Sequence, residues 1–245
     1  MNNPFLFKAS VITALLFILN SAHSASAPSV ETKLGDPAAG EAQAAVCAGC
    51  HGADGNSPAP SFPKLAGLGE KYLTKQLKDI QAGNLQMAAL QSGEIDEKDL
   101  KSGTRPVAQM IGMLDGKSEQ DLKDLAAFYN SKPMQLTGSK PLEVRVNAGI
   151  KVDGLVLGER VFRAGNLETG VPACTGCHSP RGLGNEPAGY PRLSGQYADY
   201  IAKQLREFRG GIRVNDGDSN TMRQVAELMS DAEIDAVANY ISGLN

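Results

Sequence analysis

Apolar side chains recur at helical spacing in two distant parts of the chain. In each part they are spaced as one face of an α-helix requires. Glycine follows each set, at Gly83 and at Gly210-Gly211, so we predict one amphipathic helix ending at each glycine position. The two sets are Tyr72, Leu73, Leu77 and Ile80, and Tyr197, Tyr200, Ile201, Leu205 and Phe208.

A second amphipathic helix follows each of these, and its first residues carry a helix-start signal. Ser118 is followed three residues later by Asp121, and Ser230 by Glu233. Each serine and its acid can form a capping box, in which both satisfy backbone N–H groups. We expect the apolar positions of these helices to face a core: Leu122, Leu125 and Phe128, and Ile234, Val237 and Ile241.

The two parts are copies of one sequence unit. The segment PKLAG at 63–67 returns as PRLSG at 191–195, and the capped helix at 118–131 matches that at 230–243 with an offset of 112. Similarity at fixed offsets is the signature of an internal repeat. The first copy carries about 16 extra residues within 83–106, which we expect to be a loop.

The pattern predicts an all-α fold with two tandem domains. A shorter helix opens each domain, at about 40–46 and 158–164. We expect an extended linker, in which the alternation of Leu142, Val144 and Val146 with polar residues would also permit a short strand. The predicted bounds are 35–138 for the N-terminal domain, 139–154 for the linker and 155–245 for the C-terminal domain.

The first 27 residues have the features of an export signal. Lys8 gives a positive start, residues 11–19 form an apolar run, and Ala-Ser-Ala at 25–27 resembles a cleavage site. Cleavage after Ser24 is an alternative. An uncleaved membrane anchor is another, although the run is short for a bilayer span. We expect residues 1–27 to be a signal peptide that is removed.

Composition narrows the function classes. The chain has a formal net charge of −3, and loss of Lys8 with the signal peptide makes it slightly more acidic. We therefore expect no nucleic-acid partner, since such proteins carry a basic footprint. The chain has no tryptophan and only 5% aromatic residues, which is little for a core of this size. We expect a group other than side chains to fill part of the interior.

Each copy contains one Cys-x-x-Cys-His motif, at 47–51 and at 174–178, and the two motifs use all four cysteines. Two structural disulfides are one interpretation, but each would close a tiny loop, remove little unfolded-state entropy and leave the histidine unexplained. A zinc site is a second, but the motifs are far apart and the chain is exported. Covalent c-type haem explains all three residue types, because the cysteines bond to vinyl groups and the histidine binds iron.

The sequence therefore predicts two covalently bound haem c groups. On one turn of helix, cysteines three residues apart present both sulfurs to one porphyrin edge, and the next residue points at the metal. The predicted attachment residues are Cys47, Cys50, Cys174 and Cys177, and the predicted iron ligands are His51 and His178.

Methionine is the leading candidate for the second axial ligand. His23 lies in the predicted signal peptide, so no spare histidine remains, and methionine is an established ligand of c-type haem. Met110 and Met222 occupy equivalent positions at the offset of 112, and we predict that they bind iron. We interpret the other methionines of the mature chain as apolar filling: Met87, Met113, Met134 and Met229.

The chain resembles the two-haem class I cytochromes c of the cytochrome c-four family. The resemblance covers about 35–245 and implies two tandem class I cytochrome c domains, each wrapped around one haem. It also implies that the carbonyls of Pro63 and Pro191 accept a hydrogen bond from His51 and His178, and it agrees with Met110 and Met222 as ligands. The matching segments are CAGCHGADGNSPAPSFPKLAG, KYLTKQLKDIQAG, PACTGCHSPRGLGNEPAGYPRLSGQ and NDGDSNTMRQVA.

The resemblance implies a periplasmic carrier of single electrons between respiratory complexes, and not an enzyme. The partners it implies are a quinol-oxidising complex and a terminal oxidase, with the mature chain either free in the periplasm or associated with the membrane surface. The alternative is the haem subunit of a periplasmic oxidoreductase, either a sulfide- or thiosulfate-oxidising enzyme or a peroxidase. An enzyme acting at haem needs an open iron or an unusual ligand such as cysteine, and no cysteine is spare.

Overall fold

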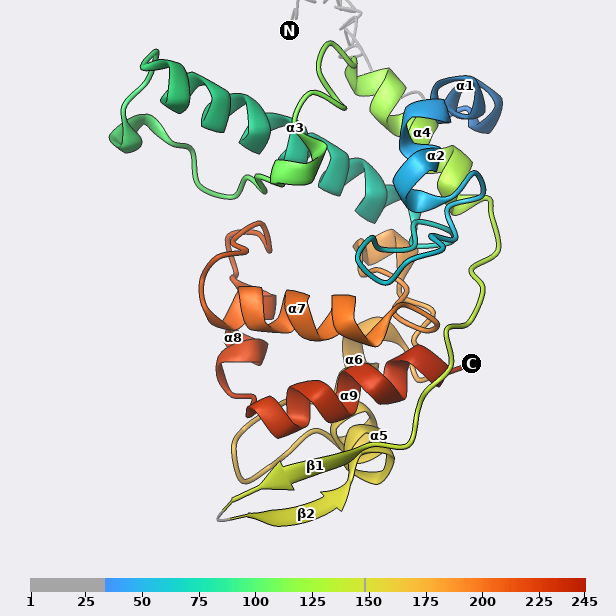
Figure 1. Ribbon diagram of the computed structural model, residues 1–245, viewed down its shortest axis with the longest axis vertical. Helices are drawn as coiled ribbons and strands as arrows, with labels where there is room; N and C mark the ends of the chain where they lie inside the picture. The colour runs from blue at the N-terminus through green and yellow to red at the C-terminus, as the bar shows by residue number, and fades with distance from the viewer. Residues whose placement is uncertain (1–33, 148) are drawn as a thin grey trace, which may run out of the picture. The chain divides into compact units, whose positions relative to one another are not determined.

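Helices are the main regular elements of the computed structural model, which describes residues 34–147 and 149–245 (Figure 1). The predicted signal peptide, residues 1–27, lies outside this part of the chain. The N-terminal repeat contains α1 (Pro37–Gln43), α2 (Ala45–His51), α3 (Glu70–Ser92), η1 (Glu97–Asp99), η2 (Ala108–Met110) and α4 (Glu119–Asn130). After a hairpin of β1 (Glu143–Val146) and β2 (Ile150–Asp153) come α5 (Gly154–Ala164), α6 (Thr175–His178), η3 (Glu186–Ala188), α7 (Ala198–Arg209), α8 (Thr221–Glu227) and α9 (Asp231–Gly243). The all-α prediction is confirmed, with this small hairpin added.

Both predicted capping boxes are present. The Ser118 hydroxyl accepts the backbone N–H of Asp121, whose carboxylate accepts the Ser118 N–H at 2.8 Å. Ser230 and Glu233 repeat this arrangement at 2.9 Å. Such reciprocal bonds satisfy N–H groups that a helix start leaves without an intrahelical partner. Consequently α4 and α9 begin where the local sequence specifies.

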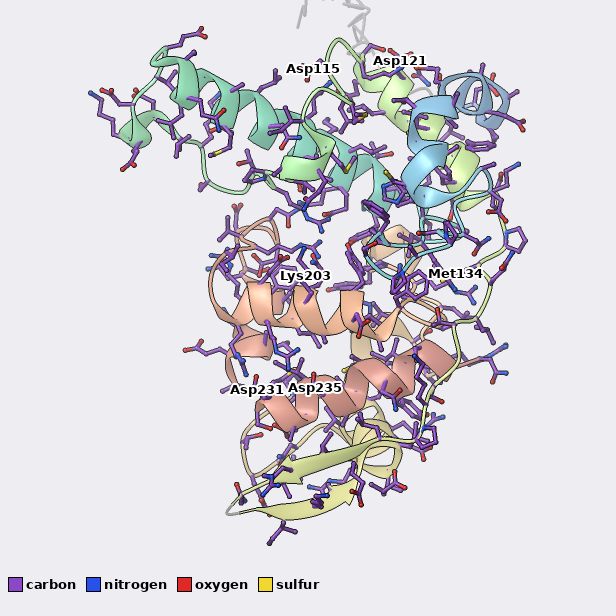
Figure 2. The ribbon with its side chains drawn as sticks, viewed as in Figure 1. Asp115, Asp121, Met134, Lys203, Asp231 and Asp235 are labelled. Atoms are coloured by element: carbon purple, nitrogen blue, oxygen red, sulfur yellow. The ribbon has the colours of Figure 1, made fainter. Side chains whose placement is uncertain are left out.

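The two capped helices, α4 and α9, pack against the other helices of their repeats and contribute to the two cores. In the N-terminal repeat α4 packs against α1 and α3, and in the C-terminal repeat α9 packs against α5 and α7. Ion pairs from Arg206 to Asp235 and from Arg209 to Asp231 join α7 to α9, and Figure 2 shows both aspartates at the amino-terminal end of α9. The apolar positions expected to face the cores are all buried: Leu122, Leu125 and Phe128, and Ile234, Val237 and Ile241.

The helix that begins at Glu70 does not end at Gly83, contrary to the prediction. It continues to Ser92, and Gly93 ends it with a left-handed φ of 76°. Gly83 is buried inside the helix, and a β-carbon there would lie 2.5 Å from the backbone nitrogen of Pro106. Glycine is present because another backbone segment approaches closely, and the sequence signal was misread as a stop.

The segment 83–106, predicted to be a loop, is therefore partly helical. It contains the last turns of α3 and the short η1, then returns so that the backbone N–H of Arg105 donates to the carbonyl of Asp79 at 2.9 Å. The equivalent helix α7 ends at Arg209, with Gly210 as its cap, as predicted.

The linker forms an antiparallel hairpin and not one short strand. Glu143 lies opposite Asp153, and Val146 opposite Ile150. The second strand was missed, although Ile150, Lys151, Val152 and Asp153 alternate apolar and polar residues as strictly as the first strand does. The backbone N–H of Gly154 donates to the Leu142 carbonyl at 2.7 Å and leads directly into α5.

Hydrogen bonds join the two repeats within residues 33–245, which form one compact unit. The Lys64 backbone N–H donates to Gln196 Oε1 at 3.0 Å, and Gln196 Nε2 donates to the Lys64 carbonyl at 2.9 Å. The buried Lys64 ammonium donates to the Gln135 and Gly195 carbonyls and to the Thr137 hydroxyl. Within the described ranges, no helix is both long and apolar enough to cross a bilayer.

Candidate haem sites

Each Cys-x-x-Cys-His motif lies at the end of a short helix. In the N-terminal repeat α2 carries Cys47 and Cys50 and ends at His51. In the C-terminal repeat Cys174 directly precedes α6, which ends at His178. The two histidines are only 8% and 7% exposed. Helix geometry thus brings the two sulfurs of each motif and its imidazole to one local surface.

A proline carbonyl binds each histidine ring. His51 Nδ1 lies 2.8 Å from the Pro63 carbonyl oxygen, and His178 Nδ1 lies 2.9 Å from that of Pro191. A carbonyl oxygen can only accept a hydrogen bond, so the proton is on Nδ1 in both rings. Nε2 is then the ring nitrogen left to bind iron.

Aromatic rings and burial complete the surroundings of the two histidines. Phe62 meets the His51 ring edge-on at a centroid distance of 6.2 Å, and Tyr190 meets His178 at 6.0 Å. Burial lowers the pKa of both histidines, and the bond to the proline carbonyl opposes that shift. The neutral imidazole is the form that binds a metal.

Neither the disulfide nor the zinc interpretation finds support in the geometry. The four cysteines all lie in described segments, and none is in a disulfide. In the part of the chain that the structure describes, no three side chains of His, Cys, Asp or Glu come together to hold a metal ion. Burial raises the pKa of the Cys47 thiol, and it raises that of Cys174 to about 11.

The two methionines that the repeat singles out lie on different short elements. Met110 ends η2, is half-buried and packs beside a small apolar cluster that contains Leu122. Met222 is the second residue of α8 and is also half-buried. Met113 is 44% exposed, whereas Met229 is buried in the core of the C-terminal repeat. Ligation by Met110 and Met222 stays a prediction.

Two buried polar atoms of the N-terminal repeat have no hydrogen-bond partner among the described residues: Asn84 Nδ2 and the Tyr129 hydroxyl. Asn84 Oδ1 accepts the backbone N–H of Val107 at 2.8 Å, and Tyr129 packs beside Cys47. A buried polar group without a partner costs about 1–3 kcal/mol. The Tyr129 hydroxyl therefore fits a site that a further group completes, as a haem attached to Cys47 would.

Arg105 connects the two repeats at a place that sequence reasoning did not identify. Its Nη1 donates to Gln76 Oε1 in its own repeat at 2.9 Å. Its Nη2 donates to Gln204 Oε1 at 2.7 Å and to the Tyr200 hydroxyl at 3.1 Å, both in the C-terminal repeat.

Arg213 makes the equivalent set of hydrogen bonds from the C-terminal repeat to the N-terminal repeat. It donates to Gln204 Oε1 in its own repeat at 2.6 Å, and to Gln76 Oε1 at 2.9 Å and the Tyr72 hydroxyl at 3.2 Å in the other. Neither Arg105 nor Arg213 forms an ion pair with any carboxylate in the described segments. The repeat offers a signal that was overlooked, since two pairs are equivalent at an offset of 128: Tyr72 with Tyr200, and Gln76 with Gln204.

Comparison with known proteins identifies relatives over most of the chain. Residues 37–131 and 156–245 each match the family model described as cytochrome c. Cytochrome c4 of Azotobacter vinelandii is 50% identical over 211 residues, which cover 86% of this chain and 90% of that protein. A thiosulfate dehydrogenase electron acceptor of Thiomonas intermedia is 34% identical over 207 residues, covering 84% and 81%. The crystal structure of reduced recombinant cytochrome c4 from Pseudomonas stutzeri has 47% identity and a TM-score of 0.74, with 86% of this chain and 100% of that chain covered.

Proposed function

We propose that this chain, which belongs to the cytochrome c family, shuttles single electrons between respiratory complexes of the periplasm. It is an electron-transfer protein with two haem c groups and not an enzyme. Bound haem c supplies one-electron chemistry at its iron. The observation that carries the proposal is the pair of repeated motifs, each with a buried histidine held by a proline carbonyl.

We propose that the two irons have the same kind of ligands. His51 and Met110 bind the first iron, and His178 and Met222 bind the second. The repeat supports this pairing, because these methionines are equivalent at an offset of 112. Histidine and methionine together close the iron to exogenous ligands and favour a relatively high reduction potential.

Pro63 and Pro191 have a positioning role in this proposal. Each carbonyl accepts a hydrogen bond from the Nδ1–H group and so fixes the plane of the imidazole ring. A histidine that donates such a bond is a better electron donor to the metal. The neighbouring rings of Phe62 and Tyr190 exclude water from the same side.

The two bridging arginines suit the acidic side groups of haem c. Arg213 is only 7% exposed, and its bonds run to neutral amide and hydroxyl groups. A buried charge without a counter-charge is costly, and the carboxylates of a bound haem provide that counter-charge. We propose that Arg105 and Arg213 hold these carboxylates where the repeats meet.

The proposed domain bounds are 35–138 and 155–245, with 139–154 as the connection. The family model matches inside these bounds, at 37–131 and 156–245. The predicted signal peptide at 1–27 supports the periplasm as the location. We propose a quinol-oxidising complex and a terminal oxidase as the redox partners.

A second function is favoured by a relative with a different name. The protein of Thiomonas intermedia is named a thiosulfate dehydrogenase electron acceptor and is 34% identical. Under this alternative, the chain takes electrons from a thiosulfate-oxidising enzyme. Both functions need the same closed haem sites, so the rate of reduction by each donor enzyme distinguishes between them.

An absorption spectrum of the mature protein tests the proposal. We expect two haems per chain, a far-red ferric band typical of sulfur-ligated iron, and no change when carbon monoxide is added to the reduced protein. A high-spin ferric band or a large carbon monoxide shift would mean that one iron is open. The carrier proposal would then give way to an enzymatic role.

A further inference from the structure

The ring of Tyr129 is held rigidly beside the first cysteine of the N-terminal motif. The residue lies on α4 and is 3% exposed, and Cys47 packs against the same apolar cluster. Phe128 contacts the ring edge-on at 4.9 Å, and the ring lies so close to Gly55 that a β-carbon there would be 2.7 Å from Tyr129 Cδ1. The hydroxyl therefore cannot swing away to reach solvent.

The Tyr129 hydroxyl is buried without a hydrogen-bond partner in the part of the chain that the structure describes. Cys47 packs against the cluster that contains Tyr129, and each of the two groups shifts the pKa of the other. Leaving such a hydroxyl unsatisfied costs about 1–3 kcal/mol. The sulfur of Cys47 is thus the acceptor that the structure offers.

The C-terminal repeat has no such hydroxyl. The residue equivalent to Tyr129 at the offset of 112 is Ile241, which is buried in the core on α9. Cys174, the first cysteine of the second motif, packs against the core that contains Ile241. The same position beside the same cysteine is polar in one repeat and apolar in the other.

Haem attachment sets the direction of the bond. A thiol can donate or accept, but a thioether sulfur has no proton and can only accept. Once Cys47 is a thioether, the Tyr129 O–H is the donor. Its partial positive charge then lies against the sulfur that joins the first haem to the chain, and a positive charge there favours the electron-richer, reduced state.

We propose that Tyr129 is a positioning residue that donates an O–H···S hydrogen bond to the Cys47 thioether and raises the reduction potential of the first haem alone. The inference rests on haem attachment at Cys47 and does not depend on which residues are the axial methionines. It identifies a built-in chemical difference between two otherwise repeated sites.

The test is the Tyr129→Phe variant of the complete, matured protein. Phenylalanine keeps the ring and its packing and removes only the hydroxyl. The matched control is Tyr240→Phe, because Tyr240 directly precedes Ile241 on α9, packs near Phe162 and Arg163, and has Arg163 and Glu159 as the polar groups beside its hydroxyl. Haem content is measured first, then the midpoint potentials of both haems, and then the resonance Raman C–S stretching bands in H₂O and D₂O.

In Tyr129→Phe we expect the potential of one haem to fall and that of the other to stay constant. The equilibrium constant for sharing one electron between the haems then changes several-fold. One C–S band shifts in D₂O in the parent protein, and this sensitivity is lost in the variant. Tyr240→Phe behaves as the parent.

Two results would overturn the inference: unchanged potentials in Tyr129→Phe, or C–S bands that do not respond to D₂O in the parent. Equal shifts of both potentials would also overturn it, because the effect would then not be local to the first site. A parent protein with fewer than two haems would instead refute the haem assignment, so the two failures are distinguishable.

Discussion

Gly83 and Pro106 approach so closely that a β-carbon on Gly83 would lie 2.5 Å from the Pro106 nitrogen. The contact places the chain at Arg105 and Pro106 against the middle of α3. One residue further along each of the two segments, Asn84 Oδ1 accepts the backbone N–H of Val107 at 2.8 Å. These two contacts hold the start of the turn that ends at Met110.

We predict that Gly83→Ala destabilises the protein. The added methyl group must displace backbone, and overpacking of this kind costs about 1–3 kcal/mol. The measurement is the free energy of unfolding in urea. The control is Gly49→Ala, at an exposed helical glycine where a β-carbon meets nothing within 4 Å and where alanine adds up to about 1 kcal/mol of stability. Equal stability of the two variants would contradict the close approach.

The proposed methionine ligands make a spectroscopic prediction. Met110→Ala and Met222→Ala should each open one iron, so that half of the reduced haem binds carbon monoxide and the far-red ferric band loses about half of its intensity. Met113→Ala and Met229→Ala should leave both features unchanged, although the Met229 variant loses stability because that side chain is buried. Carbon monoxide binding in either of these control variants, and not in the first pair, would refute the equivalence drawn from the repeat.

Arg213 should contribute strongly to stability. Arg213→Met removes the Arg213 donor from the Tyr72 hydroxyl and from Asn215 Oδ1, whereas Gln76 and Gln204 keep Arg105 as a donor. Each buried polar group left without a partner costs about 1–3 kcal/mol. We expect a loss of at least about 2 kcal/mol, measured by urea unfolding of the oxidised protein.

The matched control for Arg213→Met is Arg163→Met, which removes a surface pair with Glu159 one helical turn away. Surface ion pairs of this kind contribute little to stability, because water and salt screen them. If Arg213→Met were as mild as this control, the network would not join the repeats energetically.

Glu233 should make the free energy of unfolding depend on pH in the acidic range. Burial raises the pKa of Glu233, but bonds from Asn166 Nδ2 at 2.8 Å and from Ser230 outweigh burial and hold the pKa below its usual value. The carboxylate therefore stabilises the fold fully above the unfolded-state pKa of about 4.3, and this contribution is lost as pH falls through the lower pKa of the folded state.

The variant Glu233→Gln checks this dependence. Glutamine keeps an acceptor for Ser230 but does not titrate. We expect the variant to be less stable than the parent at neutral pH, and the difference between the two to shrink as pH falls toward about 3. Urea unfolding at a series of pH values measures it. A difference that stays constant over the whole pH range would show that charge at this position does not matter.

Local features of the sequence were sufficient for much of the fold. The capping boxes at Ser118 and Ser230 form because their partners lie three residues away. The two Cys-x-x-Cys-His motifs need only one helical turn to gather their functional groups. Comparing the repeats singled out Met110 and Met222 without any knowledge of their surroundings.

The tertiary structure decided the features that depend on residues far apart in the chain. Gly83 looks like a helix end in the sequence, and only its contact with Pro106 shows why it lies inside α3. The repeated Tyr72/Tyr200 and Gln76/Gln204 pairs are visible in the sequence, but only the fold shows that Arg105 and Arg213 each reach across to the other repeat to bind them. Helix starts and motif geometry follow from bonds between near neighbours, which the local order of residues specifies. Close backbone approach and bridging hydrogen bonds arise only when folding brings distant segments together.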